Sequence, residues 1–166
     1  MIVRERTESD LDACLELARV VNETDDYPVY LPADLRSFLF PAQAIAAWVA
    51  EIDGHIVGHV ALHQRGNDTV MQVVADVTGL PADRFGVVAR LIVAPEARRL
   101  GVGRVLLQTA ADDAVDRGLQ PMLDVVTRHS AAVRLYEDAK WIRVAEVVVQ
   151  FGDVEVEELV YLAPSS

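Results

Sequence analysis

The chain has 166 residues and a mass of 18.2 kDa, which fits one domain, and 52% of its residues are hydrophobic, enough to form a substantial core. Its formal net charge of -11 would repel phosphates and anionic lipid head groups, so nucleic acid and membrane surfaces are excluded as general partners. No apolar stretch approaches the roughly 20 residues that span a bilayer, and the N-terminus has no apolar signal core, so we expect a soluble, cytoplasmic protein.

The first part of the chain predicts a short strand, at residues 2–6, followed by two helices. The sequence TESD at residues 7–10 has the form of a capping box, and it opens a helix with Leu11, Leu15, Ala18 and Val21 on one apolar face. The single cysteine, Cys14, lies among these residues and is predicted to fill the core. Residues 22–32 predict a loop, and a short helix through Leu35, Phe38 and Leu39 follows.

A β-hairpin is predicted next. Two runs of strand-forming residues, 46–52 and 55–63, flank Asp53-Gly54, the dipeptide that favours a type I′ turn. Residues 67–79 have apolar side chains at helical spacing and predict an extra helix, although their β-branched content leaves a strand open.

The rest of the chain alternates strands with amphipathic helices. Strands are predicted at residues 87–93 and 122–127, helices from residue 102 to Gly118 and at 131–139, and closing strands at 143–150 and 154–162. This order predicts an α/β fold with a central sheet covered by helices, as one domain over residues 1–166. The apolar closing strands would either fill the core or pair across a homodimer.

The segment APEARRLGVGRVLL joins a predicted strand to a predicted helix, and it contains R-x-x-G-x-G as Arg98, Gly101 and Gly103. Glycines let the backbone approach a ligand closely, and the N–H groups at a helix start point toward a bound anion. Arginines 98, 99 and 104 add positive charge in an acidic chain. The pattern is neither a P-loop nor a dinucleotide fingerprint, which would need glycine at Leu106. It predicts a pyrophosphate site, with solvated arginines at a helix start as the alternative.

The string RLIVAPEARRLGVGRVLL resembles motif A of the GNAT superfamily of N-acetyltransferases, and LDVVTRHSAAVRLYEDAKWIRV resembles its motif B. The second string departs from the usual pattern at His129, Lys140 and Trp141, where asparagine, glycine and phenylalanine are common. Together the motifs cover roughly residues 87–144. The resemblance implies a GNAT-like mixed sheet whose central strands splay apart.

The resemblance also implies acetyl-CoA as the cofactor and direct transfer of the acetyl group to an amine. Backbone groups of Leu91, Ile92 and Val93 would pair with the pantetheine arm as an added strand. The pyrophosphate would be held by Arg98, Arg99, Leu100, Gly101, Val102, Gly103 and Arg104. A backbone N–H near Val93 would polarise the thioester carbonyl.

Two side chains of motif B are candidates by the same resemblance. Tyr136 would be the general acid for the departing thiolate, or a core residue. His129 precedes it by two helical turns, and it would contact the cofactor or only cap its helix. The general base has no clear candidate, because the early strand positions Val87, Val88 and Ala89 carry no titratable group. We expect a water-relayed base, with Glu51, Asp76 and Asp124 as relays.

His59 and His63 are four residues apart on a predicted strand, so they would share a face and assist deprotonation, or lie on a solvated face. By the same resemblance, the acceptor would be enclosed by the loop with Asp25, Asp26, Tyr27 and Tyr30, whose carboxylates and aromatic rings would suit an amine, or these residues only fix the loop. No set of His, Cys and carboxylate positions has zinc spacing, so no metal is expected.

Three functions remain open on the sequence. The first, which we favour, is acetylation of a primary amine on a small-molecule substrate. The second is acetylation of a protein N-terminus or lysine. The third is a catalytically weak acyl-CoA-binding regulatory module, which the departures at His129 and Lys140 and the missing base keep open.

Overall fold

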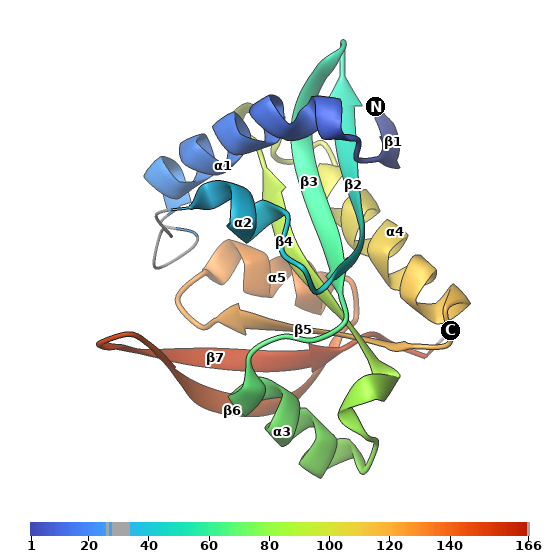
Figure 1. Cartoon of the computed structure of the whole chain (residues 1–166), viewed down its shortest axis with the longest axis vertical. Coiled ribbons are helices and arrows are strands. Elements are labelled where there is room, and N and C mark those ends of the chain that lie inside the picture. Colours follow the sequence, from blue (N-terminus) through green and yellow to red (C-terminus); the bar gives the residue numbers. More distant parts are fainter. Residues whose placement is uncertain (26, 28–33, 166) are drawn as a thin grey trace. The chain divides into compact units, whose positions relative to one another are not determined.

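The structure is a computed structural model that describes residues 1–25, 27 and 34–165. It confirms the mixed α/β fold, with a seven-stranded sheet of order β1-β2-β3-β4-β5-β7-β6 and flanking helices (Figure 1). The chain forms two compact units: unit 1 comprises residues 1–62 and 88–110, and unit 2 comprises residues 63–87 and 111–166. Strand β4 (Phe85–Val93) and helix α4 (Val102–Asp116) each contribute to both units. Among the described residues, no helix is long and apolar enough to cross a membrane.

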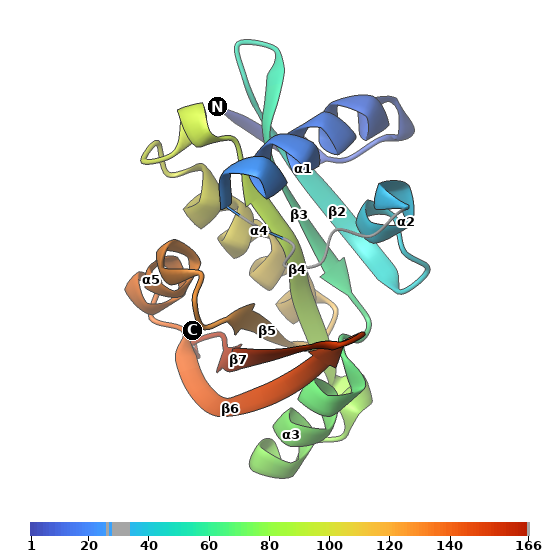
Figure 2. The same cartoon turned by 90° about the vertical axis from the view of Figure 1, so that its left-hand side faces the viewer.

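Unit 1 contains the antiparallel strands β1 (Ile2–Glu5), β2 (Ala44–Ile52) and β3 (His55–His63), whose last residue enters unit 2. The β2–β3 turn is the predicted hairpin turn, because Asp53 and Gly54 have φ values of 51° and 79°, both positive as type I′ requires. Helices α1 (Leu11–Asp25) and α2 (Leu35–Leu39) lie on one face of these strands, and the first turns of α4 lie on the other (Figures 1 and 2).

Helix α1 begins at the predicted capping box and ends later than predicted. The Thr7 N–H donates to Asp10 Oδ2 over 2.8 Å, and a 3₁₀ turn at Glu8–Asp10 leads into the helix. The helix buries Cys14, Leu17, Ala18 and Val21. The loop predicted for residues 22–32 is wrong over residues 22–25, since no proline or glycine interrupts the helical pattern before Pro28. Residues 26 and 28–33 of that loop lie outside the described part of the chain.

Unit 2 contains α3 (Asp68–Thr78), β5 (Gln120–Val126), α5 (Ser130–Asp138), β6 (Ile142–Phe151) and β7 (Val154–Leu162). Strand β5 pairs in parallel with β4 and antiparallel with β7, and β7 pairs antiparallel with β6. Helix α3 covers a core cluster in this unit, formed by Val70, Met71, Val74, Phe85, Val87, Met122, Val147, Val149 and Val160. The closing strands β6 and β7 therefore supply core side chains, which is the first alternative predicted for them, filling the core.

The extra helix predicted for residues 67–79 is confirmed as α3, and its ends explain why the helix prevails over a strand. Asn67 caps the start by accepting from the N–H groups of Thr69 and Val70 through its side chain. Gly79 ends it in the left-handed conformation, with φ 74°. Both ends are stabilised locally, and this offsets the weak helix propensity of the valines between them.

Candidate active site

The predicted pyrophosphate loop follows β4 directly. A 3₁₀ turn at Pro95–Ala97 ends the strand, residues 98–101 form an exposed turn, and α4 begins at Val102. Gly101 has a φ of 81°, and a Cβ added there would meet nothing within 4 Å. Glycine is thus favoured at this position by the left-handed backbone and not by lack of space.

The start of α4 offers N–H groups that an anion can bind. The first backbone bond of the helix runs from Val105 N–H to Gly101 O over 3.1 Å, so the N–H groups before it have no intrahelical acceptor. Within the described chain, residues 99–104 donate none of the backbone hydrogen bonds found outside regular elements. These N–H groups lie at the positive end of a 15-residue helix and fit a diphosphate.

Gly58 on β3 lies against the beginning of this helix. A Cβ on Gly58 would lie 2.8 Å from both Leu106 Cδ1 and Val102 Cγ1, so only glycine allows the first turn of α4 to approach the strand this closely. Val102 and Leu106 are buried at this contact. Sequence analysis missed Gly58, and the signal was a glycine in the middle of a strand.

Arg98 is already engaged in an ion pair. Its guanidinium donates to both carboxylate oxygens of Asp25, at 3.0 Å for the Nη1 bond to Oδ1, and its Nη2 also donates to Val93 O over 3.3 Å. Sequence analysis places Asp25 in the acceptor loop, but it is the last residue of α1 and contacts Arg98 instead. Because both side chains are more than one-third exposed, the pair contributes only about 0–1 kcal/mol of stability.

The backbone of Leu91–Val93 follows the part of β4 that pairs with β5. In the described chain that pairing covers only Phe85–Val87, opposite Gln120–Met122. On the β3 side the strand continues until the Ala94 N–H donates to Val57 O over 2.8 Å. One backbone edge of Leu91–Val93 therefore suits the added-strand contact that the resemblance implies.

Arg90 lies within β4 and has a φ of 57°, which is rare for a residue other than glycine. Its Nε donates to Phe38 O over 2.9 Å, and its guanidinium lies 3.9 Å from the centre of the Phe38 ring. The ring of Tyr27 lies 6.3 Å from the ring of Phe38. Sequence analysis missed Arg90, and the signal was a lone charge in an apolar strand. Tyr27, a predicted acceptor residue, is thus connected to β4 through Phe38, whereas Asp26 and Tyr30 lie outside the described residues.

His59 is fully buried, and both of its ring nitrogens are bound. Arg6 Nη1 lies 2.8 Å from Nε2, and because arginine cannot accept a hydrogen bond, Nε2 accepts and Nδ1–H donates to Arg90 O over 2.9 Å. Burial lowers the pKa of His59 from 6.5 to about 4. The solvated face predicted as one alternative for His59 and His63 is wrong, since both are buried. His59 is held as a neutral link between strands, which argues against a role as a base.

The lowered pKa of His59 predicts how stability depends on pH. Between pH 6.5 and about 4 the unfolded chain binds a proton at His59 that the folded chain does not, so stability falls as pH decreases through this range. At about 1.4 kcal/mol per pKa unit, the loss is about 3 kcal/mol. Urea unfolding of His59→Gln, whose amide can make both contacts without titrating, is expected to show a smaller loss over that range. His55→Gln, at an exposed histidine on the same strand, serves as the control; an undiminished loss in His59→Gln would contradict the assignment.

Tyr136 and His129 lie on and before α5, in unit 2. Tyr136 is 8% exposed, and its ring lies 6.4 Å from that of Trp141 and 6.0 Å from that of Tyr161. His129 occupies the N-cap position, where its carbonyl accepts from the Val133 N–H over 3.1 Å. The motif B departure at Lys140 also has a structural account, because Lys140 adopts a φ of 68°, the conformation for which glycine is the usual residue.

The three predicted relays have different surroundings. Glu51 is bound to the Arg4 guanidinium at 2.6 Å, and Asp76 accepts from the Gln72 side chain on the exposed side of α3. Asp124 lies beside Glu158 of β7, a buried carboxylic acid that sequence analysis missed. The signal was present: Glu158 alternates in phase with Val156 and Val160, two residues away on either side and both buried. Burial and Asp124 raise the pKa of Glu158 well above its ordinary value of 4.5.

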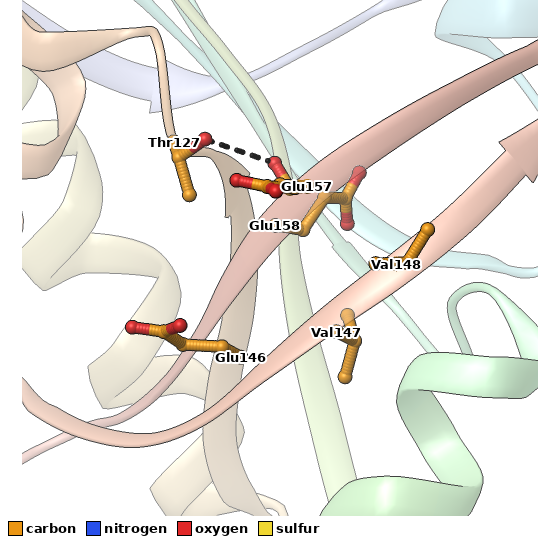
Figure 3. A pocket seen from close by; sticks show the side chains of 6 residues that line it. All are labelled: Thr127, Glu146, Val147, Val148, Glu157 and Glu158. Atoms are coloured by element: carbon orange, nitrogen blue, oxygen red, sulfur yellow. Dashed lines mark hydrogen bonds between the residues drawn. The ribbon is translucent and has the colours of Figure 1, made fainter.

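Glu158 also lines a pocket of about 260 Å³ in unit 2, together with Thr127, Glu146, Val147, Val148 and Glu157 (Figure 3). Three of the six lining residues are glutamates, and two are valines. Within the described chain, no group of three or more His, Cys, Asp and Glu residues is arranged to hold a metal ion.

Comparisons with known proteins agree with this geometry. The model of the "Acetyltransferase (GNAT) family" matches residues 11–140, and no curated protein sequence matches the chain. Three similar solved structures show the same fold. A ribosomal-protein-alanine N-acetyltransferase from Brucella melitensis has 18% identity and a TM-score of 0.72, with 98% of each chain covered.

The second is yncA, a putative acetyltransferase from Salmonella typhimurium solved with its cofactor acetyl-CoA, at 17% identity and a TM-score of 0.67, covering 97% of this chain and 91% of that one. The third is NAA60 from Arabidopsis thaliana in complex with acetyl-CoA, at 14% identity and a TM-score of 0.71, covering 97% and 96%. Since the family model spans most of the chain and its loop offers the N–H groups that a diphosphate needs, this protein belongs to the GNAT family of acetyltransferases, enzymes that use acetyl-CoA as acyl donor.

Proposed function

We propose that the chain transfers an acetyl group from acetyl-CoA to a primary amine of a small molecule, directly within one ternary complex, and that residues 1–166 act as one catalytic domain. The observation that carries the proposal is the set of N–H groups at the start of α4, flanked by Arg98, Arg99 and Arg104. Together with Leu100 to Gly103 they would hold the diphosphate of the donor. The backbone edge at Leu91–Val93 would receive the pantetheine arm, with His129 as a further cofactor contact.

Acetyl-CoA supplies the thioester, and the protein orients it beside the amine, so no protein nucleophile is needed. Cys14 fits this view: it is fully buried, and burial raises the pKa of its thiol to about 11, so the thiolate required for attack does not form near neutral pH. A backbone N–H near Val93 would polarise the carbonyl oxygen. Tyr136 would donate a proton to the leaving thiolate, and its low exposure is consistent with a site that excludes water.

The acceptor is proposed to be small and cationic. The net charge of -11 favours cations in general. A protein acceptor is the second candidate, since one similar structure is a ribosomal-protein-alanine N-acetyltransferase. Tyr27 would contact the acceptor from the α2 side, with Asp26 and Tyr30 proposed from the sequence alone.

Calorimetry and a thiol-release assay test the proposal together. Acetyl-CoA is expected to bind with heat, and CoA release with small primary amines is expected to exceed release with peptides bearing an N-terminal alanine or an internal lysine by about tenfold. Faster release with the peptides would favour the protein acceptor. Binding without release for any amine would favour the regulatory module, and no binding of acetyl-CoA would overturn the site.

A further inference from the structure

Two half-buried arginines in unit 1 converge on the end of α2. Arg6, which follows β1, donates from Nη1 to Leu39 O over 2.7 Å. Arg90 of β4 donates from Nε to Phe38 O over 2.9 Å. Each guanidinium group also lies over an aromatic ring, at 3.5 Å from the centre of the Phe40 ring for Arg6 and at 3.9 Å from that of Phe38 for Arg90. Two positive charges are therefore held next to consecutive carbonyl groups of the chain.

The charges of these two arginines are not compensated by a bound carboxylate. In the described chain their guanidinium groups bind neutral acceptors, which are backbone carbonyls and, for Arg6, the ring of His59. Asp10, a carboxylate whose charge acts on Arg6, has both of its oxygens bound to Arg4 at 2.8 Å. Burial lowers the pKa of Arg6, and after burial the charges of Arg6 and Arg90 are further causes of the lowered pKa of His59, so both charges act at the same place. An anion would stabilise this pair of arginines.

Arg90 has donor groups left for such an anion. Its Nε bond to Phe38 O is the usual way in which an arginine binds one of the last carbonyls of a helix. That bond leaves Nη1 and Nη2, neither of which binds an acceptor within the described residues. Neither atom is fully buried, so a ligand can reach both. The two nitrogens form the planar fork that matches the two oxygens of a carboxylate.

We propose that Arg90, together with the positive charge of Arg6, binds a carboxylate of the acceptor, so that the amine acetylated by this protein belongs to an amino acid. The inference rests on the proposed function and adds a second group to its acceptor. The cation of the proposed function is then the amine end of the acceptor, and the carboxylate is the other end.

Arg90 lies close in the chain to the backbone edge proposed for the cofactor. It directly precedes Leu91–Val93 and is three residues, or about 10 Å along the strand, from Val93. The Phe38 ring beneath its guanidinium group is also 6.3 Å from the ring of Tyr27, which is proposed to contact the acceptor. The cofactor loop, this part of β4 and both arginines all belong to unit 1. An acceptor up to about 10 Å long can therefore present its amine to the thioester while Arg90 holds its carboxylate.

A titration followed by NMR tests binding without turnover. The ligands are glycine, 4-aminobutanoate and 6-aminohexanoate, which differ in the distance between amine and carboxylate, and the primary amide of each, which lacks the negative charge. In wild-type protein, at least one of the acids is expected to shift the Nε–H signal of Arg90 to saturation, at a concentration about tenfold or more below that required by its amide. If none of the acids gives a saturable shift, or if acids and amides act equally, the inference is overturned.

Turnover separates a carboxylate site from a structural contact. In wild-type protein, kcat/KM is expected to be about tenfold or more higher for the acid that binds best than for its amide. In Arg90→Gln this ratio is expected to be close to one, because glutamine keeps a donor for Phe38 O but carries no charge. The matched control is Arg36→Gln, which removes one positive charge from an exposed position of α2 and should keep the wild-type ratio. If Arg90→Gln loses activity equally toward acid and amide, Arg90 has only a structural role and the inference is overturned.

The same measurements distinguish this inference from the proposed function. Equal kcat/KM for acids and amides in wild type overturns the inference, while the proposed function stands. Saturable binding of an acid at Arg90 without acetylation of any amine supports the arginine site and contradicts the proposed function. Thermal melts show whether the variants are folded, and if Arg90→Gln is not, the titration of the wild-type protein decides by itself.

Discussion

Replacement of Tyr136 by phenylalanine is expected to lower kcat by about 10- to 1,000-fold while the Kd for acetyl-CoA stays within about twofold of wild type. The substitution removes the hydroxyl proposed to protonate the thiolate. It keeps the ring, which packs 6.4 Å from Trp141 and 6.0 Å from Tyr161, so the fold should not change. Steady-state thiol release measures kcat, and calorimetry measures the Kd.

The control for this prediction is Tyr161→Phe. Tyr161 is fully buried in the same unit, and its hydroxyl donates to Glu137 Oε1 over 3.3 Å, so this variant also deletes one phenolic hydroxyl. We expect it to cost about 1 kcal/mol of stability and to leave kcat near wild type. Equal kcat in wild type and Tyr136→Phe would remove Tyr136 from the mechanism, and equal losses in both variants would point to packing.

Gly101→Val is expected to weaken acetyl-CoA binding by about 30-fold or more. A valine cannot adopt the φ of 81° at Gly101 without strain, so the turn before α4 must change and its N–H groups no longer converge on the diphosphate. Calorimetry with acetyl-CoA measures the loss, and urea unfolding measures the accompanying cost in stability of about 1–3 kcal/mol.

Gly79→Val is a matched control for Gly101→Val. Gly79 has a φ of 74°, and like Gly101 it has nothing within 4 Å of an added Cβ, but it ends α3 and is not part of the predicted cofactor loop. The two variants should lose similar stability, and only Gly101→Val should lose affinity. Similar acetyl-CoA affinities in both variants would show that the turn at residues 98–103 does not bind the cofactor.

Local sequence patterns predicted the helices, strands and turns well, because strand alternation, helical spacing and turn residues each depend on a few residues close together in the sequence. The Asp53-Gly54 turn and the α3 and α4 helices follow from such patterns and are confirmed. The end of α1 was placed too early, since loop residues such as Asp25 do not stop a helix on their own. The sequence predicted a cofactor site only where one continuous segment would form it, at residues 98–103, and this stays a prediction.

The remaining features of the site depend on partners distant in sequence. The sequence alone could not show that Arg98 is bound to Asp25, 73 residues away, or that His59 is buried between Arg6 and Arg90. The burial of Glu158 beside Asp124 is apparent only from the strand register. Charge and burial at such positions are set by neighbours that the chain brings together on folding.

By itself, the sequence determined the order of helices and strands, the glycine turn that leads into α4 and the resemblance to one family of acetyltransferases, because each of these is encoded in residues close together along the chain. Only the tertiary structure decided which side chains are buried, which charges are paired and where a carboxyl group such as that of Glu158 is buried beside a second one. The physical reason is that solvation and electrostatic interactions depend on distances through space, and these arise from contacts between residues far apart in the sequence.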